Sequence, residues 1–484
     1  MEIKSLKHNF FMYFLRLFSG FGFTIFIFPY IARKLGAEGI GRIQYIEIIV
    51  SYFILFINLG VADYGKREVA ICRDNSKRLN DIVNDLLTIL YITTALGVLV
   101  YLFFICFFVQ DKVNSKLLYI YFVSMILNMF NVEWFYVGME NQEYITKRNI
   151  ILKIFSAILI FLFVKTSEDI YFYAGILVLA TTGSNIYNFF NLRKYVSLKI
   201  KKYKDIKRHF RRLFYIFFSA IALSISYNLD SLMIGKMVGD TELGYYSLAG
   251  KFGRMPLVLG TVVITILAPR LTNLLGQNNK KMYYKLWKSG IDVIFIFYIP
   301  LTVGMYLLSK PLVLIIGGVN FIEAVPMFRL FSIYITIMGF ACLTGVTLDT
   351  HRRDKEYSIS VIIGSSLNFL FNIFFIMKIG AIGAVIATLI TEIVAILVRI
   401  VLCKDIFKKL KLIDLNMLKL IGASIIMGGV VFYIERIIQN IFLKVGISTI
   451  VGAIVYGIVL VILKERVVLQ VISKLKKIVN LQKA

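Results

Sequence analysis

The sequence lacks the signatures of the common enzyme classes. It contains no Gly-x-x-x-x-Gly-Lys-Ser/Thr loop for nucleotide hydrolysis and no visible Ser/His/Asp set. Its three histidines (His8, His209 and His351) are isolated in basic stretches, and its four cysteines are scattered without ligand or disulfide spacing. We therefore predict a protein that is not an enzyme and that uses no metal or cofactor.

Acidic residues are also scarce. The chain has 28 of them against 55 lysines and arginines, for a formal net charge of +27. In a soluble protein this excess would suggest a nucleic-acid partner. Here the basic residues gather in short segments between apolar runs, as the positive-inside rule predicts for cytoplasmic loops. We therefore expect contact with membrane lipids and none with nucleic acid.

Long apolar runs dominate the 484 residues, of which 59% are hydrophobic. The runs are about 20 residues long, which is the length of a membrane-spanning helix, and the alternating pattern of a membrane β-barrel is absent. The predicted fold is an all-α polytopic membrane protein with about fourteen transmembrane helices. The expected spans are 10–32, 43–63, 82–109, 117–138, 149–165, 170–191, 213–235, 245–270, 288–308, 325–347, 357–377, 380–402, 416–435 and 446–463.

Basic residues favour every second loop by roughly three to one, so both termini are expected in the cytoplasm. We predict a six-helix lobe over residues 1–192, a basic cytoplasmic linker over 193–212 and a second six-helix lobe over 213–403. Two extra helices and a basic cytoplasmic tail are expected over 404–484. The linker and the tail are candidate contacts for anionic lipid headgroups.

A turn with two glycines five residues apart occurs twice. Gly36 and Gly41 follow a basic residue that ends an apolar run, and so do Gly239 and Gly244. Other short matches share the offset of about 200 residues, which indicates a parallel internal repeat. Transporters whose two lobes rock about a central cavity are built from such repeats.

Charged residues inside the expected spans are costly unless they face a cavity or a partner. The cations are Arg16, Lys251, Arg254 and Arg329, and the acids are Glu133, Asp230 and Glu392. We interpret the cations as the lining of a positive cavity that binds a diphosphate headgroup, because the arginine fork matches phosphate oxygens. The acids are candidates for coupling to H⁺ or Na⁺, or for acids of the cavity.

Other interpretations of these charges stay open. Arg16 could snorkel to the cytoplasmic face or pair with Glu133 across the lobe. Asp230 could be a hydrogen-bonded structural residue. Glu392 could form a helix–helix salt bridge, since Arg399 lies seven residues later on the same helix face.

Several segments resemble the polysaccharide biosynthesis (Wzx-type) flippases of the multidrug/oligosaccharidyl-lipid/polysaccharide exporter superfamily. These segments are Pro29–Gly41, Leu59–Ala70, Gly138–Glu140, Asp230–Ala249 and Ile382–Glu392. The resemblance implies two six-helix lobes around a central cavity, plus two C-terminal helices. It also implies a bacterial inner-membrane protein that moves undecaprenyl-diphosphate-linked oligosaccharides outward by alternating access, for O-antigen, capsule or exopolysaccharide synthesis.

The resemblance leaves some partners and competing functions open. A polysaccharide polymerase and chain-length proteins are candidate partners, and ion coupling would make the protein an antiporter. A lipid II flippase would use the same headgroup chemistry. A multidrug exporter of the same superfamily predicts twelve spans and an acidic cavity. A membrane glycosyltransferase or polymerase would need a large outward loop, whereas the outward segment near 309–324 is short.

Overall fold

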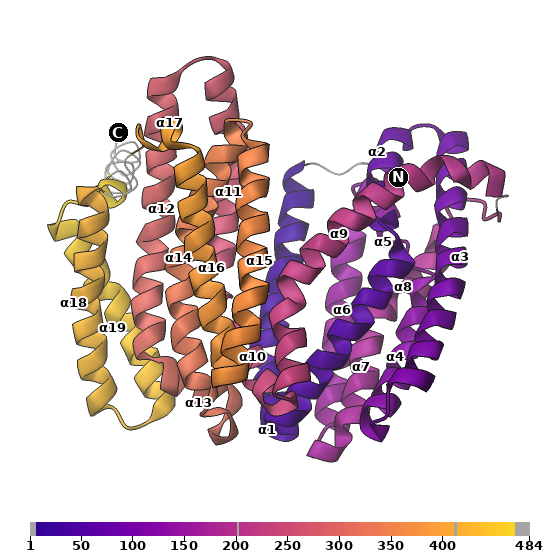
Figure 1. The fold of residues 1–484 in the computed structure, drawn as a ribbon, viewed down its shortest axis with the longest axis horizontal. Helices are drawn as coiled ribbons and strands as arrows, with labels where there is room; N and C mark the ends of the chain where they lie inside the picture. Colours follow the sequence, from indigo (N-terminus) through magenta and orange to yellow (C-terminus); the bar gives the residue numbers. More distant parts are fainter. Residues whose placement is uncertain (1–5, 201–202, 411–413, 470–484) are drawn as a thin grey trace, which may run out of the picture. The chain divides into compact units, whose positions relative to one another are not determined.

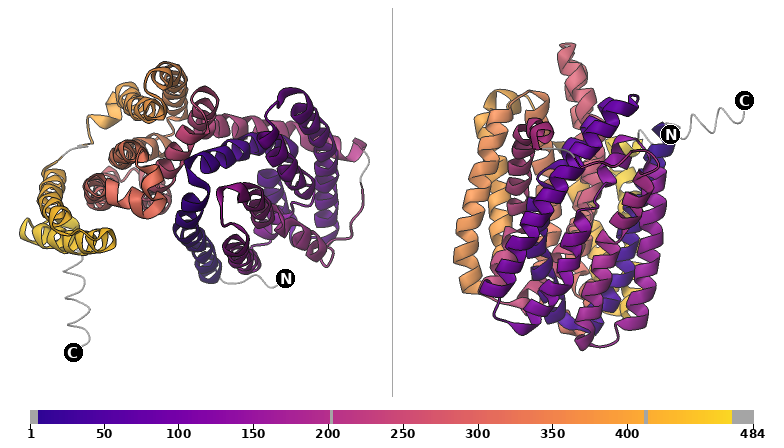
Figure 2. Two further views of the ribbon diagram at one scale, coloured as in Figure 1. Left: turned by 90° about the horizontal axis from the view of Figure 1, so that it is seen from below. Right: turned by 90° about the vertical axis from the view of Figure 1, so that its right-hand side faces the viewer.

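The computed structural model describes residues 6–200, 203–410 and 414–469. These residues form nineteen α-helices and two short 3₁₀ helices, and no strand occurs among them. The chain packs as two compact units, residues 1–235 and 236–484, each of which is a bundle of roughly parallel and antiparallel helices (Figures 1 and 2). The all-α fold predicted from the apolar runs is confirmed.

The first unit contains nine of the α-helices. They are α1 (Leu6–Asn58), α2 (Val61–Cys72), α3 (Ser76–Phe108), α4 (Lys112–Asn128), α5 (Glu133–Gly138), α6 (Gln142–Phe163), α7 (Ile170–Thr182), α8 (Ser184–Leu192) and α9 (Tyr203–Met237), with the 3₁₀ helix η1 (Ser167–Asp169) before α7. Helix α1 packs against α3, α4 and α6, while the short α2 packs against α3 and α5. A buried apolar cluster joins α2, α3, α5 and the beginning of α9.

The second unit is built around α14. Its helices are α10 (Asp240–Gly253), α11 (Leu257–Gly276), α12 (Lys280–Leu307), α13 (Ser309–Gly317), α14 (Ala324–Thr350), α15 (Asp354–Ile379), α16 (Ala381–Leu402), α17 (Lys404–Phe407), α18 (Leu415–Ile437) and α19 (Ile441–Ile462), with η2 (Val319–Phe321) before α14. Helix α14 contacts α10, α11, α12, α15 and α16. The predicted second lobe began at residue 213, whereas the structure counts α9 with the first unit.

The two glycine turns found in the sequence have similar backbone conformations. Gly36 interrupts α1 with φ 70° and ψ −177°, and Gly239 precedes α10 with φ 113° and ψ 179°. Positive φ is a conformation that side chains rarely allow, so glycine is required at both turns. The equivalence of these two turns supports the repeat.

The expected spans fall on single helices or on pairs. Helix α1 covers the first two expected spans. Three other expected spans are each formed by a pair of consecutive helices: α4 with α5, α7 with α8, and α10 with α11. Of the helices in the described part of the chain, nine are long and apolar enough to cross a membrane, or ten if the bent α9 is counted. The number of fourteen crossings therefore stays a prediction.

The two extra helices, α18 and α19, pack against each other and against α12. The Tyr456 hydroxyl donates to the Ile296 carbonyl at 3.0 Å. At one end of the pair, Lys288 and Asp414 approach to 3.0 Å, and so do Arg466 and Asp292. These contacts join the two extra helices to α12 within the second unit. The basic tail beyond residue 469 lies outside the described residues.

Candidate functional site

The first unit brings two arginines to one carboxylate where α1 meets α5 and α6, and a lysine of α6 lies near one of these arginines. The predicted pair is confirmed: Arg16 Nη1 lies 3.5 Å from Glu133 Oε1. The other carboxylate oxygen of Glu133 is 2.5 Å from Arg148 Nη2. Lys153, further along α6, donates to the Ser19 hydroxyl at 3.4 Å. We call Arg16, Glu133, Arg148 and Lys153 the α1–α6 cluster.

Local structure fixes the members of this cluster. Helix α5 begins at Glu133, and Asn131 stabilises that beginning by accepting from the Glu133 backbone N–H at 3.5 Å. Helix α6 is attached to α1 because the Thr146 hydroxyl donates to the Met12 carbonyl at 2.9 Å. Arg16 and Arg148 are thereby held on either side of the same carboxylate.

Arg148 is the most deeply buried cation of the cluster. Only 7% of it is exposed, and its Nη2 also donates to Asn149 Oδ1 at 2.8 Å. Its Nε and Nη1 are buried and have no hydrogen-bond partner in the described part of the chain. A buried donor without an acceptor costs about 1–3 kcal/mol. A ligand with several acceptor oxygens would satisfy both donors at once.

The charge of the cluster favours an anion. Arg16 and Arg148 pair with Glu133, and Lys153 lies within electrostatic reach of Arg16, so the cluster keeps a positive excess after Glu133 is counted. Side chains of this kind bind phosphate oxygens, to which arginine offers parallel N–H donors and lysine a point charge.

The second unit places Arg254 in an aromatic environment directly after α10. Its guanidinium carbon lies 4.6 Å from the Phe331 ring centroid and 5.6 Å from that of Tyr334, both on α14. Arg254 Nη2 also donates to the Tyr246 hydroxyl at 2.9 Å. Cation–π contacts of this kind stabilise a charge by about 0.5–2 kcal/mol and hold the guanidinium in a fixed orientation.

The other predicted residues are distributed over both units. Lys251 is exposed on the last turn of α10. Arg329 is exposed near the beginning of α14 and donates through Nε to the Ser309 hydroxyl at 3.0 Å. Asp230 is 7% exposed on α9. Arg16 therefore belongs to the first unit, whereas Lys251 and Arg329 belong with Arg254 to the second.

Glu392 and Arg399 both lie on α16, as predicted, but no direct salt bridge joins them among the described residues. Arg399 is 6% exposed and donates instead to the Ser360 hydroxyl at 2.9 Å and to the Ala341 carbonyl at 3.0 Å. The charges of Arg399 and Arg254 act on Glu392 at longer range. Arg399 therefore joins α14, α15 and α16 as a structural residue.

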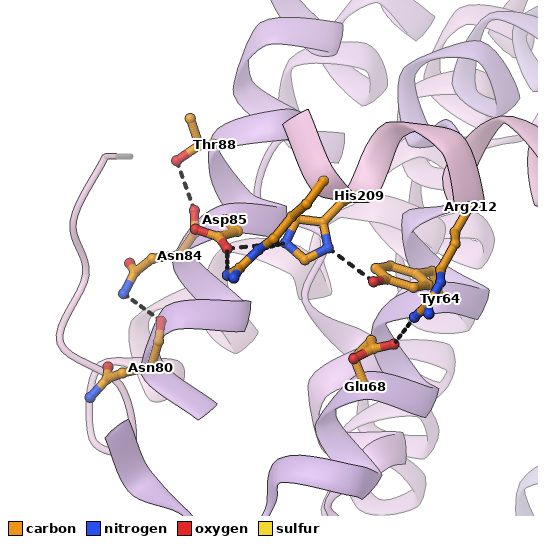
Figure 3. Close-up of polar contacts among 9 residues, drawn as sticks. Tyr64, Glu68, Asn80, Asn84, Asp85, Thr88, His209 and Arg212 are labelled. Carbon is orange, nitrogen blue, oxygen red and sulfur yellow. Dashed lines mark hydrogen bonds and ion pairs between the residues drawn. The ribbon is translucent and has the colours of Figure 1, made fainter. Parts of the chain in front are cut away.

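Sequence reasoning missed Arg148, Lys153 and a second polar cluster. Arg148 lies between the expected spans 117–138 and 149–165, so it was not counted among the charges inside them. Lys153 lies inside the expected span 149–165, and a lone lysine there was a signal that could have identified it. His209 was interpreted as an isolated loop histidine. In the structure it lies buried between Tyr64 and Asp85 (Figure 3).

Comparison with known proteins identifies the family. A model of the family described as "Polysaccharide biosynthesis protein" matches residues 6–275, which is more than half of the chain. The chain belongs to this family. A second model, MatE, matches residues 216–374. The resemblance inferred from the sequence segments is therefore confirmed.

Relatives of this chain include a curated Escherichia coli (strain K12) protein named "Putative O-antigen transporter". It is 22% identical over 371 residues, which cover 73% of this chain and 85% of that protein. Among solved structures, the lipid II flippase MurJ in an inward closed conformation has a TM-score of 0.71 at 19% identity and covers 94% of this chain and 98% of its own.

An inward-facing multidrug resistance MATE transporter of the MOP superfamily has a similar fold. Its TM-score is 0.59 at 12% identity, with 80% of this chain and 95% of its own covered. At these identities the structures establish the shared fold. The families and the similar structures are those of transporters and flippases rather than enzymes.

Proposed function

We propose that this protein is a flippase of the bacterial inner membrane that carries an oligosaccharide linked to undecaprenyl diphosphate from the cytoplasmic to the outer leaflet. The observation that carries the proposal is the α1–α6 cluster, with its positive excess and the two buried donors of Arg148 that have no partner among the described residues. Family membership and the relative named as an O-antigen transporter support the lipid-linked substrate.

The diphosphate is the chemical group that suits this cluster. Its oxygens can accept from Arg148 Nε and Nη1 while the charges of Arg16 and Lys153 attract it. Glu133 competes with the ligand for both arginines. Protonation of Glu133 would remove that competition, so substrate binding and proton binding would favour each other. Ion coupling through Glu133, and through Asp230 and Glu392, is part of this proposal.

The two-unit fold supports a transport cycle by alternating access. Alternating access moves the headgroup and its sugars while the lipid tail stays in the bilayer. Arg254, oriented by its aromatic neighbours, is a candidate second contact for the headgroup in the second unit, with Lys251 and Arg329 as further cations. Docking of a polysaccharide polymerase or chain-length proteins would follow delivery of the substrate, with both termini of the flippase in the cytoplasm.

Complementation tests the proposal. The gene is deleted in its host, and surface polysaccharide is measured after restoring wild type, Arg148→Gln, Arg148→Lys or Arg254→Ala at matched protein level. We expect wild type to restore polysaccharide, Arg148→Gln and Arg254→Ala to fail, and Arg148→Lys to restore part, because lysine keeps the charge and loses the fork. Arg436→Gln is the matched control, because Arg436 is exposed and lies over the Phe432 ring at 4.3 Å.

Two competing functions give different outcomes. The MatE match favours a multidrug exporter as the second candidate. In that case deletion leaves polysaccharide intact and raises drug sensitivity. A lipid II flippase shares the diphosphate chemistry, but its deletion would stop peptidoglycan synthesis and be lethal.

A further inference from the structure

A pocket lies in the first unit where the beginning of α7 meets α1 and the beginning of α4, at the lower end of that unit in Figure 1. Its volume is about 550 Å³, within the range of about 300–1,000 Å³ that small-molecule sites occupy. The polar part of its lining comes from Glu38 and Arg42 of α1, Ser167 and Glu168 of η1, and Tyr171 of α7. We call these five residues the η1 pocket.

The internal repeat has a different structure at the corresponding position of the second unit. The third residue after the turn glycine is Gly39 in the first unit, whereas it is Glu242 in the second. Glu242 Oε2 accepts from the Ala381 backbone N–H at 3.2 Å, so α10 closes on the beginning of α16. Glycine has no side chain for such a contact, and α1 borders a pocket beside the beginning of α7 instead. The η1 pocket is therefore a difference between the two units rather than a property of the repeat.

The charges of the η1 pocket balance. Glu38 and Arg42 lie one helical turn apart and form a salt bridge at 3.1 Å. Glu168 adds a second carboxylate, and the Lys116 ammonium adds a second cation, 5.7 Å from the centroid of the Tyr171 ring. Two acids and two bases leave no positive excess, in contrast to the α1–α6 cluster. A diphosphate therefore gains no charge advantage in this pocket.

The hydrogen-bonding groups of the η1 pocket suit a ligand rich in hydroxyls. The two carboxylates accept and the guanidinium donates, while the hydroxyls of Ser167 and Tyr171 can do both. A sugar ring carries several hydroxyls that each donate and accept, and its C–H groups form apolar faces between them. Leu35 and Val113 supply apolar surface to the same pocket. Both the polar edge and the apolar face of a sugar ring therefore find a matching surface.

The η1 pocket and the α1–α6 cluster lie at the two ends of the part of α1 that precedes Gly36. Arg16 lies about twenty residues before Gly36, which corresponds to about 30 Å along a helix. A diphosphate held by Arg148 therefore keeps the sugar next to it out of reach of the pocket. The predicted topology, with a cytoplasmic N-terminus, puts the Gly36 turn on the outer side after one crossing. The substrate would occupy the two sites in turn.

We propose that the η1 pocket is a carbohydrate site, which holds the oligosaccharide on the outer side after the diphosphate has left the α1–α6 cluster. The inference rests on the proposed flippase function, because the sugar is that of the lipid-linked substrate. Arg42 and Glu168 are the specificity-determining residues, which contact the sugar hydroxyls from α1 and from η1. Binding there favours the outward position of the sugar, since a ligand stabilises the state to which it binds.

Hydrogen–deuterium exchange of the purified full-length protein tests the proposal. The probe is the free repeat-unit oligosaccharide, released from the host's own surface polysaccharide by mild hydrolysis, and inorganic pyrophosphate is the comparison ligand. We expect saturating oligosaccharide to slow the exchange of residues 35–42 and 166–171 by about threefold or more, because a bound ligand opposes local opening. Pyrophosphate, which suits the α1–α6 cluster, should leave the exchange of both segments unchanged.

Arg42→Gln and Glu168→Gln test the two polar sides of the pocket. Each variant removes one charged hydrogen-bonding group, so the Kd for the oligosaccharide, measured by titration in the same exchange experiment, should rise about tenfold. Both variants should fold, because Glu168 is exposed and the Glu38 side chain that pairs with Arg42 is 65% exposed, where ion pairs contribute little to stability. Glu435→Gln, which removes a carboxylate from an ion pair in the extra helices, is the matched control and should leave the Kd unchanged.

The failure of this inference can be told apart from the failure of the flippase function. Oligosaccharide that does not slow exchange in residues 35–42 and 166–171, or a Kd that neither Arg42→Gln nor Glu168→Gln changes, would overturn the carbohydrate site and leave the flippase function standing. Gene deletion that leaves surface polysaccharide intact would overturn the flippase function, and the carbohydrate site with it.

Discussion

Replacing Glu133 by glutamine isolates the charge balance of the α1–α6 cluster. Glutamine has the shape of glutamate and mimics its protonated form. The change leaves Arg16, at 3.5 Å, and Arg148, at 2.5 Å, facing a neutral group. Two opposite effects follow: the unliganded protein should lose stability, and an anion should bind more tightly.

The burial of the two paired side chains sets the range of the stability that Glu133→Gln should lose. Removing one partner of a buried ion pair costs about 3–5 kcal/mol, whereas exposed pairs contribute about 0–1 kcal/mol. The Arg148 side chain is 6% exposed but that of Glu133 is 36% exposed, so solvent screens the pair on one side. We therefore expect a loss of about 1–3 kcal/mol.

The gain in anion affinity comes from lost competition. With the carboxylate charge removed, inorganic pyrophosphate no longer meets a negative neighbour at Arg148. We expect its Kd to fall about three- to tenfold, which corresponds to about 0.7–1.4 kcal/mol. Thermal unfolding of purified protein over a pyrophosphate titration measures both effects, because ligand binding stabilises the folded state by an amount that grows with the logarithm of one plus the ratio of ligand concentration to Kd.

Matched variants separate binding from folding. Arg148→Gln should abolish the stabilisation by pyrophosphate. Glu435→Gln is the control, because Glu435 is 29% exposed and pairs with Lys444 at 3.1 Å in the extra helices. It should lower stability without changing the Kd. The reasoning is refuted if Glu133→Gln weakens pyrophosphate binding, or if Arg148→Gln leaves it unchanged.

Two further predictions concern stability. Burial raises the pKa of Asp414, but a backbone hydrogen bond and the Lys288 ammonium at 3.0 Å outweigh it and hold the pKa below its usual range. Its stabilisation is therefore complete above about pH 5 and lost as the pH falls below about 4, a loss that Asp414→Asn should lack in melting curves recorded against pH. Gly65→Ala should destabilise by about 1–3 kcal/mol in the same assay, because its Cβ would lie 2.5 Å from the Trp134 ring, whereas Gly175→Ala, which meets nothing within 4 Å, should not destabilise.

The helices could be predicted because they depend on local properties of the chain. Apolar runs of spanning length and glycines at turns are visible without tertiary information. Even so, the sequence could not show that α10 ends at Gly253 and that a new helix begins at Leu257. That break depends on the turn around Pro256, the residue directly before α11, which lies inside the expected span 245–270.

The polar sites were harder to predict because their members are distant in sequence. Arg16 and Glu133 were recognised as a pair since both fall inside expected spans. His209 and Asp85 are 124 residues apart, and His209 stands in a stretch rich in basic residues. No local pattern indicates that α9 would carry this histidine between a tyrosine and a carboxylate.

Burial alone does not distinguish a structural arginine from a binding one. Arg399 and Arg148 are 6% and 7% exposed, and they lie on the helices α16 and α6. Arg399 donates to neutral oxygens on α14 and α15, so its hydrogen bonds are made within the fold. Arg148 keeps two buried donors without acceptors among the described residues, which is a cost that folding alone does not explain. Since a diphosphate would supply those acceptors, the unsatisfied guanidinium identifies the α1–α6 cluster, rather than the equally buried Arg399, as the place where the substrate binds in our proposal.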